Sequence, residues 1–196
     1  MIRRSDVLET VIAHGHDSPI VFTTGYTCRE AFSVRDAPNH LYMTGSMGMA
    51  PVIGVGIARQ TDRTTVVIDG DGAFLMNPGA LMVTRQYRPE NLLHLVLDNG
   101  SYESTGGQES SSAMFDIPLM ASAMGYRECT RIHDAAELRR RLPELVRDPR
   151  GPHLLYVRTQ SAPAGSHPRI TVDPAANFLR FRTWMTTDPR EEEACH

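Results

Sequence analysis

The chain has 196 residues, of which 41% are hydrophobic and 22% are charged, and its formal net charge is −3. This size and composition predict a single globular domain over residues 1–196, and the lack of a basic stripe or an RNA-binding motif makes nucleic acid an unexpected partner. No apolar run reaches membrane-spanning length and the first residues lack the apolar core of a signal peptide, so we expect a cytoplasmic protein with no membrane partner.

Two features of the composition exclude classes of site. The three cysteines Cys28, Cys129 and Cys195 are odd in number and far apart, which argues against a disulfide framework or a cysteine-based zinc site. All 20 basic residues are arginines. A chain without lysine cannot form a Schiff base with a substrate, and it cannot supply the lysine of a phosphate-binding P-loop.

Short apolar segments and glycine turns alternate along the first third of the chain. The expected elements are, in order, a helix at 5–13, a strand at 20–24, a helix at 27–32, a strand at 41–43 and a helix at 52–58. Gly54 and Gly56 lower the propensity of the last helix. They indicate either close approach of a neighbour or a cofactor, or small-residue packing alone.

A βαβ unit follows. Residues 66–73 and 92–100 are apolar runs that end in Asp-Gly and Asn-Gly, so each predicts a buried strand with polar side chains at its carboxyl end. Between them, Asn77 and Pro78 are typical of an N-cap and a first helical residue, and they predict a helix over 80–87. A right-handed crossover would bring both strand ends to one edge of a parallel sheet, where open α/β proteins bind ligands.

Asp71 and Asn99 are 28 positions apart (99 − 71) and fall at these two strand ends. Carboxylate and amide oxygens are suitable ligands for a hard divalent cation, and a phosphate held through Mg²⁺ fits the pattern. Two ordinary tight turns explain the same Asp-Gly and Asn-Gly pairs equally well on spacing alone.

The rest of the chain continues the alternation. Residues 101–112 are polar and glycine-rich and directly follow the Asn99 strand, which indicates an active-site loop. A helix is expected at 117–124, a weak strand at 126–130, a helix capped by Asp134 at 134–145 and a strand at 154–157. A Pro-rich C-terminal extension begins at about 161. It contains an expected helix at 178–185 and ends in an acidic tail. This order predicts a three-layer α/β/α domain with a six-stranded, mostly parallel sheet.

Several segments together resemble the diphosphate-binding domain of thiamine-diphosphate-dependent 2-oxoacid decarboxylases, a family that includes phosphonopyruvate decarboxylase and the β subunit of sulfopyruvate decarboxylase. The signature is Gly70-Asp71-Gly72, then the 26 residues from Ala73 to Asp98, then Asn99. Residues 23–30, 45–48 and 103–108 resemble three further segments of the family. The resemblance covers nearly the whole chain and implies the thiamine-diphosphate-binding fold.

The resemblance implies two cofactors, thiamine diphosphate and Mg²⁺. Side-chain oxygens of Asp71 and Asn99 and the backbone carbonyl of Ser101 would bind Mg²⁺ together with two diphosphate oxygens. Backbone N–H groups of Gly72 and Ala73 would hold the diphosphate. The full implied cofactor-binding set is Gly45, Ser46, Met47, Gly70, Asp71, Gly72, Ala73, Asn99, Ser101 and Tyr102.

The implied catalytic residues are Met47, Ser104, Thr105 and Gln108. Met47 would wedge between the two cofactor rings and hold the cofactor bent, while the Gly45 carbonyl accepts a hydrogen bond from its amine. The bent cofactor then serves as the electron sink for loss of CO₂. Met47 as a plain core side chain is the alternative. Hydroxyl and amide groups of the 104–108 loop would hold the anionic head of the substrate.

In this family a glutamate protonates the aminopyrimidine ring, and it lies on a separate pyrimidine-binding domain. Only 19 residues precede the first expected strand here, so we expect the β subunit of a split, hetero-oligomeric enzyme whose α subunit brings the glutamate. A fragment of a longer chain is the alternative. Many relatives have Asn where this chain has Asp98, which would add negative charge near the metal if Asp98 faces it.

The expected substrate is a short anionic 2-oxoacid. The residues of the 103–108 loop resemble phosphonopyruvate decarboxylase most and favour phosphonopyruvate, which would be converted to phosphonoacetaldehyde and CO₂. Sulfopyruvate is the first alternative, and another thiamine-diphosphate lyase or ligase is the second. A 2-oxoacid ferredoxin enzyme would usually carry iron–sulfur cysteines, which the spacing here does not offer. A non-catalytic cofactor-binding assembly subunit is an alternative from a different class.

Overall fold

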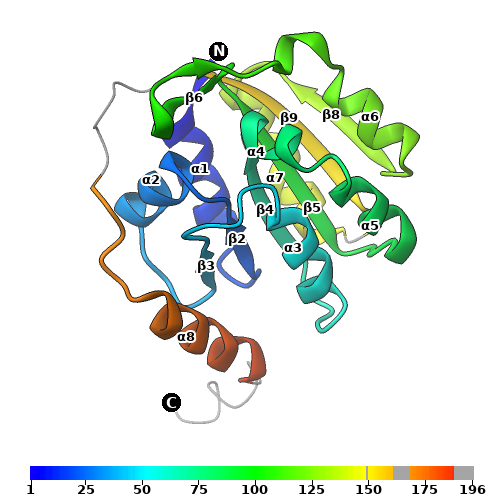
Figure 1. Ribbon diagram of the computed structural model, residues 1–196. Coiled ribbons are helices and arrows are strands. Elements are labelled where there is room, and N and C mark those ends of the chain that lie inside the picture. The colour runs from blue at the N-terminus through cyan, green and yellow to red at the C-terminus, as the bar shows by residue number, and fades with distance from the viewer. Residues whose placement is uncertain (149, 161–167, 188–196) are drawn as a thin grey trace.

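A seven-stranded parallel sheet forms the centre of the computed structural model, which describes residues 1–148, 150–160 and 168–187 (Figure 1). The strand order is β1 (Ile2–Arg3), β9 (His153–Gln160), β5 (Leu92–Asp98), β4 (Thr65–Gly70), β2 (Ile20–Phe22) and β3 (His40–Tyr42), and β8 (Glu128–Ile132) also pairs with β9. The expected α/β fold with a mostly parallel sheet is confirmed. The strand that sequence reading missed is β1, because two residues carry no readable pattern.

Helices cover both faces of this sheet and give the expected three layers (Figure 1). One face is covered by α1 (Arg4–His14), α2 (Tyr26–Val34) and α7 (Ala135–Arg147), and the other by α3 (Ala50–Ala58), α4 (Asp71–Met76), α5 (Ala80–Tyr87) and α6 (Ile117–Ala123). Side chains of each strand alternate between the faces. In β4, Val66 and Ile68 face the α1 side, whereas Val67 faces α3.

The short helix α4 was not predicted, and the prediction that Asn77 caps the helix over 80–87 is wrong. Asn77 is the C-cap of α4, and its side-chain amide donates to the Gly48 carbonyl at 3.1 Å. The N-cap residue of α5 is Gly79. A local Asn-Pro pattern cannot show that the Asn side chain will be used by a turn 29 residues earlier in the sequence.

One of the two glycines of α3 serves close packing. A Cβ at Gly54 would lie 2.2 Å from Cγ2 of Val67, so the helix approaches β4 closely only because the side chain is missing. A Cβ at Gly56 would meet nothing within 4 Å. Close approach to a neighbour is therefore confirmed for Gly54, whereas Gly56 has no such packing role.

The last described helix, α8 (Pro174–Thr186), covers the edge strand β3. Asn177 accepts from the backbone N–H of Tyr42 at 3.0 Å and donates to the His40 carbonyl at 3.0 Å, so one amide side chain takes the place of a neighbouring strand. Residues 161–167, where the expected Pro-rich extension begins, and the acidic tail over 188–196 lie outside the described residues.

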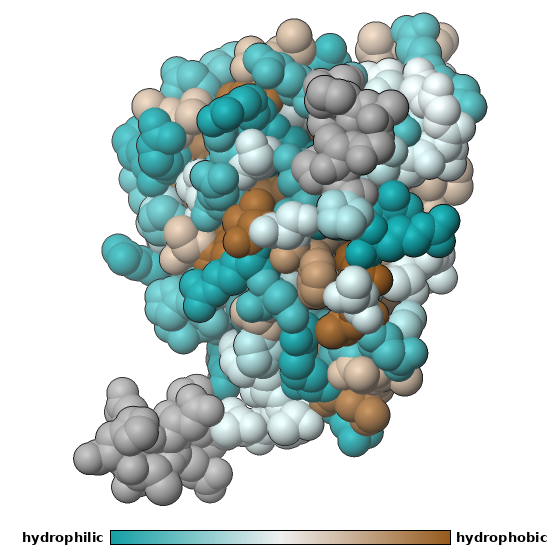
Figure 2. All heavy atoms as spheres, turned by 90° about the vertical axis from the view of Figure 1, so that its left-hand side faces the viewer, coloured by the Kyte–Doolittle hydropathy of each residue, from teal (hydrophilic) through white to brown (hydrophobic). Residues whose placement is uncertain are grey.

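Figure 2 shows the side of the molecule that carries α2 and α8. Hydrophilic residues cover most of this face, and hydrophobic residues appear as separate patches between them. On α8, Phe178 and Leu179 are about half exposed. Within the described part of the chain, no helix has the length and apolar character needed to cross a membrane.

Candidate active site

The strand order reverses between β2 and β4, since β2 is followed by β3 on one side and β4 by β5 on the other. At such a switch point the carboxyl ends of the strands leave a crevice in which α/β proteins bind ligands. A cavity lies at this point, and its lining comes from four segments and two single side chains: Thr23–Thr27, Gly70–Ala73, Leu97 with Asn99, Ser101–Ser104, Met47 and Arg4.

Most residues that the resemblance implies for cofactor binding line this one cavity. They are Met47, Gly70, Asp71, Gly72, Ala73, Asn99, Ser101 and Tyr102, and Ser104 of the implied catalytic set lines it as well. Met47 is half-buried and belongs to none of the hydrophobic clusters of the described residues, so the core reading of this side chain is not supported.

Four predicted residues do not line the cavity. Gly45 and Ser46 are exposed on the turn before Met47. Thr105 and Gln108 are exposed at the tip of the hairpin made by β6 (Ser101–Tyr102) and β7 (Gln108–Glu109), where the Gln108 amide donates to the Thr105 carbonyl at 2.9 Å. The roles of these four residues toward cofactor and substrate stay predictions.

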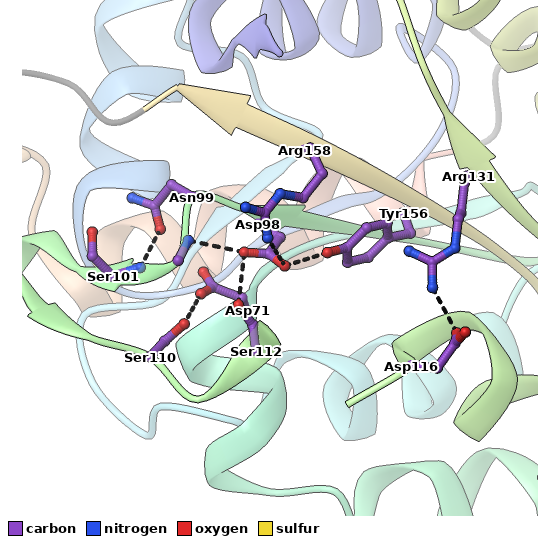
Figure 3. A network of polar contacts seen from close by, with 11 residues as sticks. Asp71, Asp98, Asn99, Ser101, Ser110, Ser112, Asp116, Arg131, Tyr156 and Arg158 are labelled. Carbon is purple, nitrogen blue, oxygen red and sulfur yellow. Dashed lines mark hydrogen bonds and ion pairs between the residues drawn. The ribbon is translucent and has the colours of Figure 1, made fainter. Parts of the chain in front are cut away.

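Asp71 is the buried carboxylate of the site (Figure 3). It begins α4, the residue is 2% exposed, and Ser110 Oγ donates a short hydrogen bond to its Oδ2. The pKa of this carboxyl is raised from 3.8 to about 6, chiefly because burial disfavours the charged form; the nearby Asp98 charge adds to the rise, and the Ser110 hydrogen bond opposes it. An ionised carboxylate held in this way is a strong ligand for a cation.

The raised pKa predicts that Asp71 destabilises the free chain at neutral pH. Because the folded-state pKa lies above the unfolded value, the folded chain loses stability as the pH rises from about 4 through about 6. The shift of about two units sets an upper limit of about 3 kcal/mol. We expect Asp71→Asn to raise the free energy of unfolding by about 1 to 3 kcal/mol at pH 8 and to leave it nearly unchanged at pH 4. Urea unfolding at both pH values measures this, and equal effects at the two would contradict it.

Asp98 does not face the cavity. Its carboxylate accepts from the Gly100 N–H at 2.9 Å, from Ser112 Oγ at 3.0 Å, from Arg158 at 3.1 Å and from the Tyr156 hydroxyl (Figure 3). Arg158 therefore balances the negative charge of Asp98. The charge still acts on Asp71, whose pKa it raises. Asp98 also fixes the turn that presents Asn99.

The cavity fits an anionic group that brings acceptor oxygens. Thr23 lines it, and the Thr23 Oγ1 atom is buried without a hydrogen-bond partner among the described residues. A buried hydroxyl without a partner is costly, so a bound acceptor would satisfy it. Within the described chain no three His, Cys, Asp or Glu side chains gather in a metal-binding geometry. The expected Mg²⁺ set needs only one carboxylate, because amide, carbonyl and diphosphate oxygens complete it.

Gly72 has a packing role that the sequence did not reveal. A Cβ at this position would lie 2.4 Å from Cε1 of Tyr102, so the tyrosine ring rests directly on the glycine. Any side chain at Gly72 would push the ring, and with it the start of the hairpin, away from the turn that carries Asp71.

Sequence reasoning left Thr23, Ser110 and Arg4 out of the site. Thr23 directly follows β2 at the same sheet edge as Asp71, so the strand-end rule used for β4 and β5 would have found it. Ser110 lies in the 101–112 segment that was expected to be an active-site loop, but no pattern singled it out there, and Arg4 carries no signal of either kind. They reach the site through the return of the hairpin and through the packing of α1, respectively.

The site lies in a segment that matches a known family. Residues 23–157 match the family described as "Thiamine pyrophosphate enzyme, C-terminal TPP binding domain". Phosphonopyruvate decarboxylase of Streptomyces viridochromogenes is 40% identical over 190 residues, which are 95% of this chain and 47% of that protein. Sulfopyruvate decarboxylase subunit beta of Methanothermobacter thermautotrophicus is 40% identical over 126 residues, 64% of this chain and 68% of that subunit. The chain thus spans about half the length of this phosphonopyruvate decarboxylase.

Solved structures show the same fold. Benzoylformate decarboxylase from Polynucleobacter necessarius superimposes with a TM-score of 0.69 at 18% identity, over 81% of this chain and 33% of that one. A 4-hydroxybenzoylformate decarboxylase of Rhodococcus jostii gives a TM-score of 0.69 at 20% identity, over 82% and 33%. At this identity the likeness concerns the fold alone.

Proposed function

The chain belongs to the thiamine pyrophosphate enzymes, and from this premise we propose that it is the small (β) subunit of a split decarboxylase acting on a short anionic 2-oxoacid. The observation that carries the proposal is the cavity at the β2–β4 switch point. It brings together the Asp71 carboxylate, the Asn99 turn and the unpartnered Thr23 hydroxyl within the matched segment.

In this proposal Asp71, Asn99 and the Ser101 carbonyl hold Mg²⁺, and the first turn of α4 holds the diphosphate beside Thr23. When bound, thiamine diphosphate supplies the electron sink for loss of CO₂ from a 2-oxoacid. Asp98 keeps the Asn99 turn in place through the Gly100 N–H, and Tyr102 closes the cavity over Gly72. Met47 lines the wall and is proposed to set the shape of the bound cofactor.

A partner chain is part of the proposal. A relative of this chain is named as subunit beta of its enzyme, and the match of this chain is to the C-terminal cofactor-binding domain of the family. We infer that a second subunit carries the pyrimidine-binding domain and its catalytic glutamate, and that the two assemble as a hetero-oligomer. Copurification of the tagged chain from its own cells identifies this subunit.

The substrate we favour is phosphonopyruvate, with sulfopyruvate as the second candidate. Relatives named for each activity are 40% identical to this chain. Both substrates carry a second anionic head, which needs hydroxyl and amide donors. The hairpin offers Ser104, which lines the cavity, and Thr105 and Gln108, which are exposed and do not line it. Aldehyde and CO₂ release from phosphonopyruvate, sulfopyruvate and pyruvate by the assembled enzyme decides between them.

The Gln108 side chain provides a test of the substrate class. If it donates to the anionic head, Gln108→Ala loses a hydrogen bond to a charged group, which costs about 1.5 to 3 kcal/mol, or about 10- to 150-fold in kcat/KM. Pyruvate has no such head, so its kcat/KM should change far less. The kcat/KM values for phosphonopyruvate and for pyruvate are measured on wild type and on Gln108→Ala at saturating cofactor.

The matched control for this test is Gln86→Ala, which removes an exposed glutamine of α5 away from the cavity. It should leave kcat/KM unchanged for both substrates. An equal loss of kcat/KM for the phosphonate and for pyruvate in Gln108→Ala would remove this residue from the substrate site.

A further inference from the structure

A buried ion-pair triad joins the start of the chain to the hairpin beside the cavity. Arg4, at the beginning of α1, donates from Nε to Glu30 of α2 at 2.5 Å and from Nη1 to Glu103 of the hairpin at 2.5 Å. The side chains of all three are at most 9% exposed. Burial alone would lower the pKa of the guanidinium, but the two hydrogen-bonded carboxylates raise it, so Arg4 stays charged.

Buried charges of this kind are sensitive to the loss of one partner. Taking one ion out of water without its counter-ion is strongly unfavourable, so each carboxylate is held where the guanidinium can reach it. Planar guanidinium geometry allows one arginine to bridge two carboxylates on different elements, which a lysine ammonium does less well. The position of Glu103 is therefore tied to α1 and α2.

Glu103 lies in the segment that closes the cavity. It follows Tyr102, whose ring rests on Gly72, and it precedes Ser104, which lines the cavity beside Gly25. At its other end the hairpin is fixed by Ser110, which bonds Asp71 and donates its N–H to the Gly100 carbonyl at 2.9 Å. The hairpin 101–110 is thus anchored once at Ser110 and once at Glu103.

We propose that Arg4 is a positioning residue that holds the hairpin 101–110 over the cofactor cavity through Glu103. Arg4 lies outside the matched segment 23–157, and it reaches the hairpin from the beginning of α1. Its unpartnered Nη2, buried among the described residues at the cavity wall, adds a positive group on the same side. The consequence for cofactor binding rests on the proposed function, whereas the anchoring of the hairpin does not.

The two carboxylates separate positioning from a merely structural role. Glu103→Gln weakens only the half of the triad that reaches the hairpin, whereas Glu30→Gln weakens the half that packs α1 on α2. Both variants remove one buried negative charge and keep the size of the side chain. Because Arg4→Gln would leave two buried carboxylates without their cation and risks unfolding, the glutamate pair is the better test.

Amide hydrogen exchange of the full chain measures the anchoring, with each variant held at the same interval below its own melting temperature. The Gly107 and Ser110 amides, which donate to Tyr102 and Gly100 carbonyls, report on the hairpin. We expect peptides covering 101–112 to exchange at least about tenfold faster in Glu103→Gln, since the hydrogen bond from Arg4 then reaches a neutral amide in place of a carboxylate and is weaker. In Glu30→Gln the same peptides should stay within about twofold of wild type while α1 and α2 exchange faster.

Calorimetric titration with thiamine diphosphate and Mg²⁺ gives the second readout. Glu103→Gln should lower the cofactor affinity about fivefold or more, and Glu30→Gln should leave it nearly unchanged. The positioning role of Arg4 would be overturned if both variants accelerated hairpin exchange equally, or if neither variant changed the exchange rate of the hairpin relative to wild type. If wild type itself binds no cofactor, the proposed function is wrong, and the exchange result still decides whether Arg4 anchors the hairpin.

Discussion

Replacing Asp71 by Asn is expected to reduce the affinity for thiamine diphosphate with Mg²⁺ by about 100-fold or more. Asp71 would be the single carboxylate in the proposed metal set, and Asn cannot supply its charge. Even residues that only support metal ligands are worth about 10- to 100-fold in metal affinity. Titration of the cofactor into the chain at fixed Mg²⁺, at pH 8 where Asp71 is ionised, measures the loss.

Two controls test whether a lower cofactor affinity comes from unfolding of the variant. Asp116→Asn removes an exposed carboxylate at the N-cap of α6 and should leave the cofactor affinity unchanged. Asp71→Asn itself should be more stable than wild type in the absence of cofactor, because the buried charge is gone. Weak binding together with raised stability would show that the loss of affinity does not come from unfolding. Unchanged affinity in Asp71→Asn would show that Asp71 does not hold the metal.

The purified chain without its partner is expected to release CO₂ at least about 100-fold more slowly than the assembled enzyme. The proposal places the glutamate that protonates the aminopyrimidine on the partner, and positioned proton transfer contributes about 10²- to 10⁴-fold. Adding the copurified subunit should restore turnover of the anionic 2-oxoacid. Steady-state CO₂ release over a titration of the partner measures this.

The matched control is the same titration with Asp71→Asn, which should assemble with the partner and stay inactive. This outcome would show that the activity belongs to the site on this chain and not to the added subunit. Turnover by the chain alone at a rate that the partner does not change would sink the split-enzyme proposal.

The burial of Asp71 shows why such a site is costly to build. The carboxylate is buried beside Asp98, which is itself balanced by Arg158, so the free chain keeps a negative group in a place where it is disfavoured. A cation bound there would relieve this cost. Residues that weaken the fold but serve a ligand are common at functional sites.

The sequence by itself determined the alternation of strands and helices, because buried parallel strands are read as apolar runs and their ends as Asp, Asn and Gly. It also placed Asp71 and Asn99 at one sheet edge, since a helical crossover joins parallel strands, whose carboxyl ends lie at the same edge. The Asp134 cap of α7 was equally local, and the structure confirms it. In each case the physical cause lies within one element or one crossover.

Only the tertiary structure decided which residues the cavity gathers. Arg4 reaches Glu103 across 99 residues, and Ser110 reaches Asp71 across 39, so neither contact has a local pattern. The same holds for Asn77, whose side chain bonds Gly48 instead of capping α5. Gln108 and Thr105 point to each other at the hairpin tip because β6 and β7 pair in this register. Contacts between distant segments depend on how the helices pack on the sheet. A local sequence pattern does not reveal that packing, because it reports only features such as strand ends and helix caps.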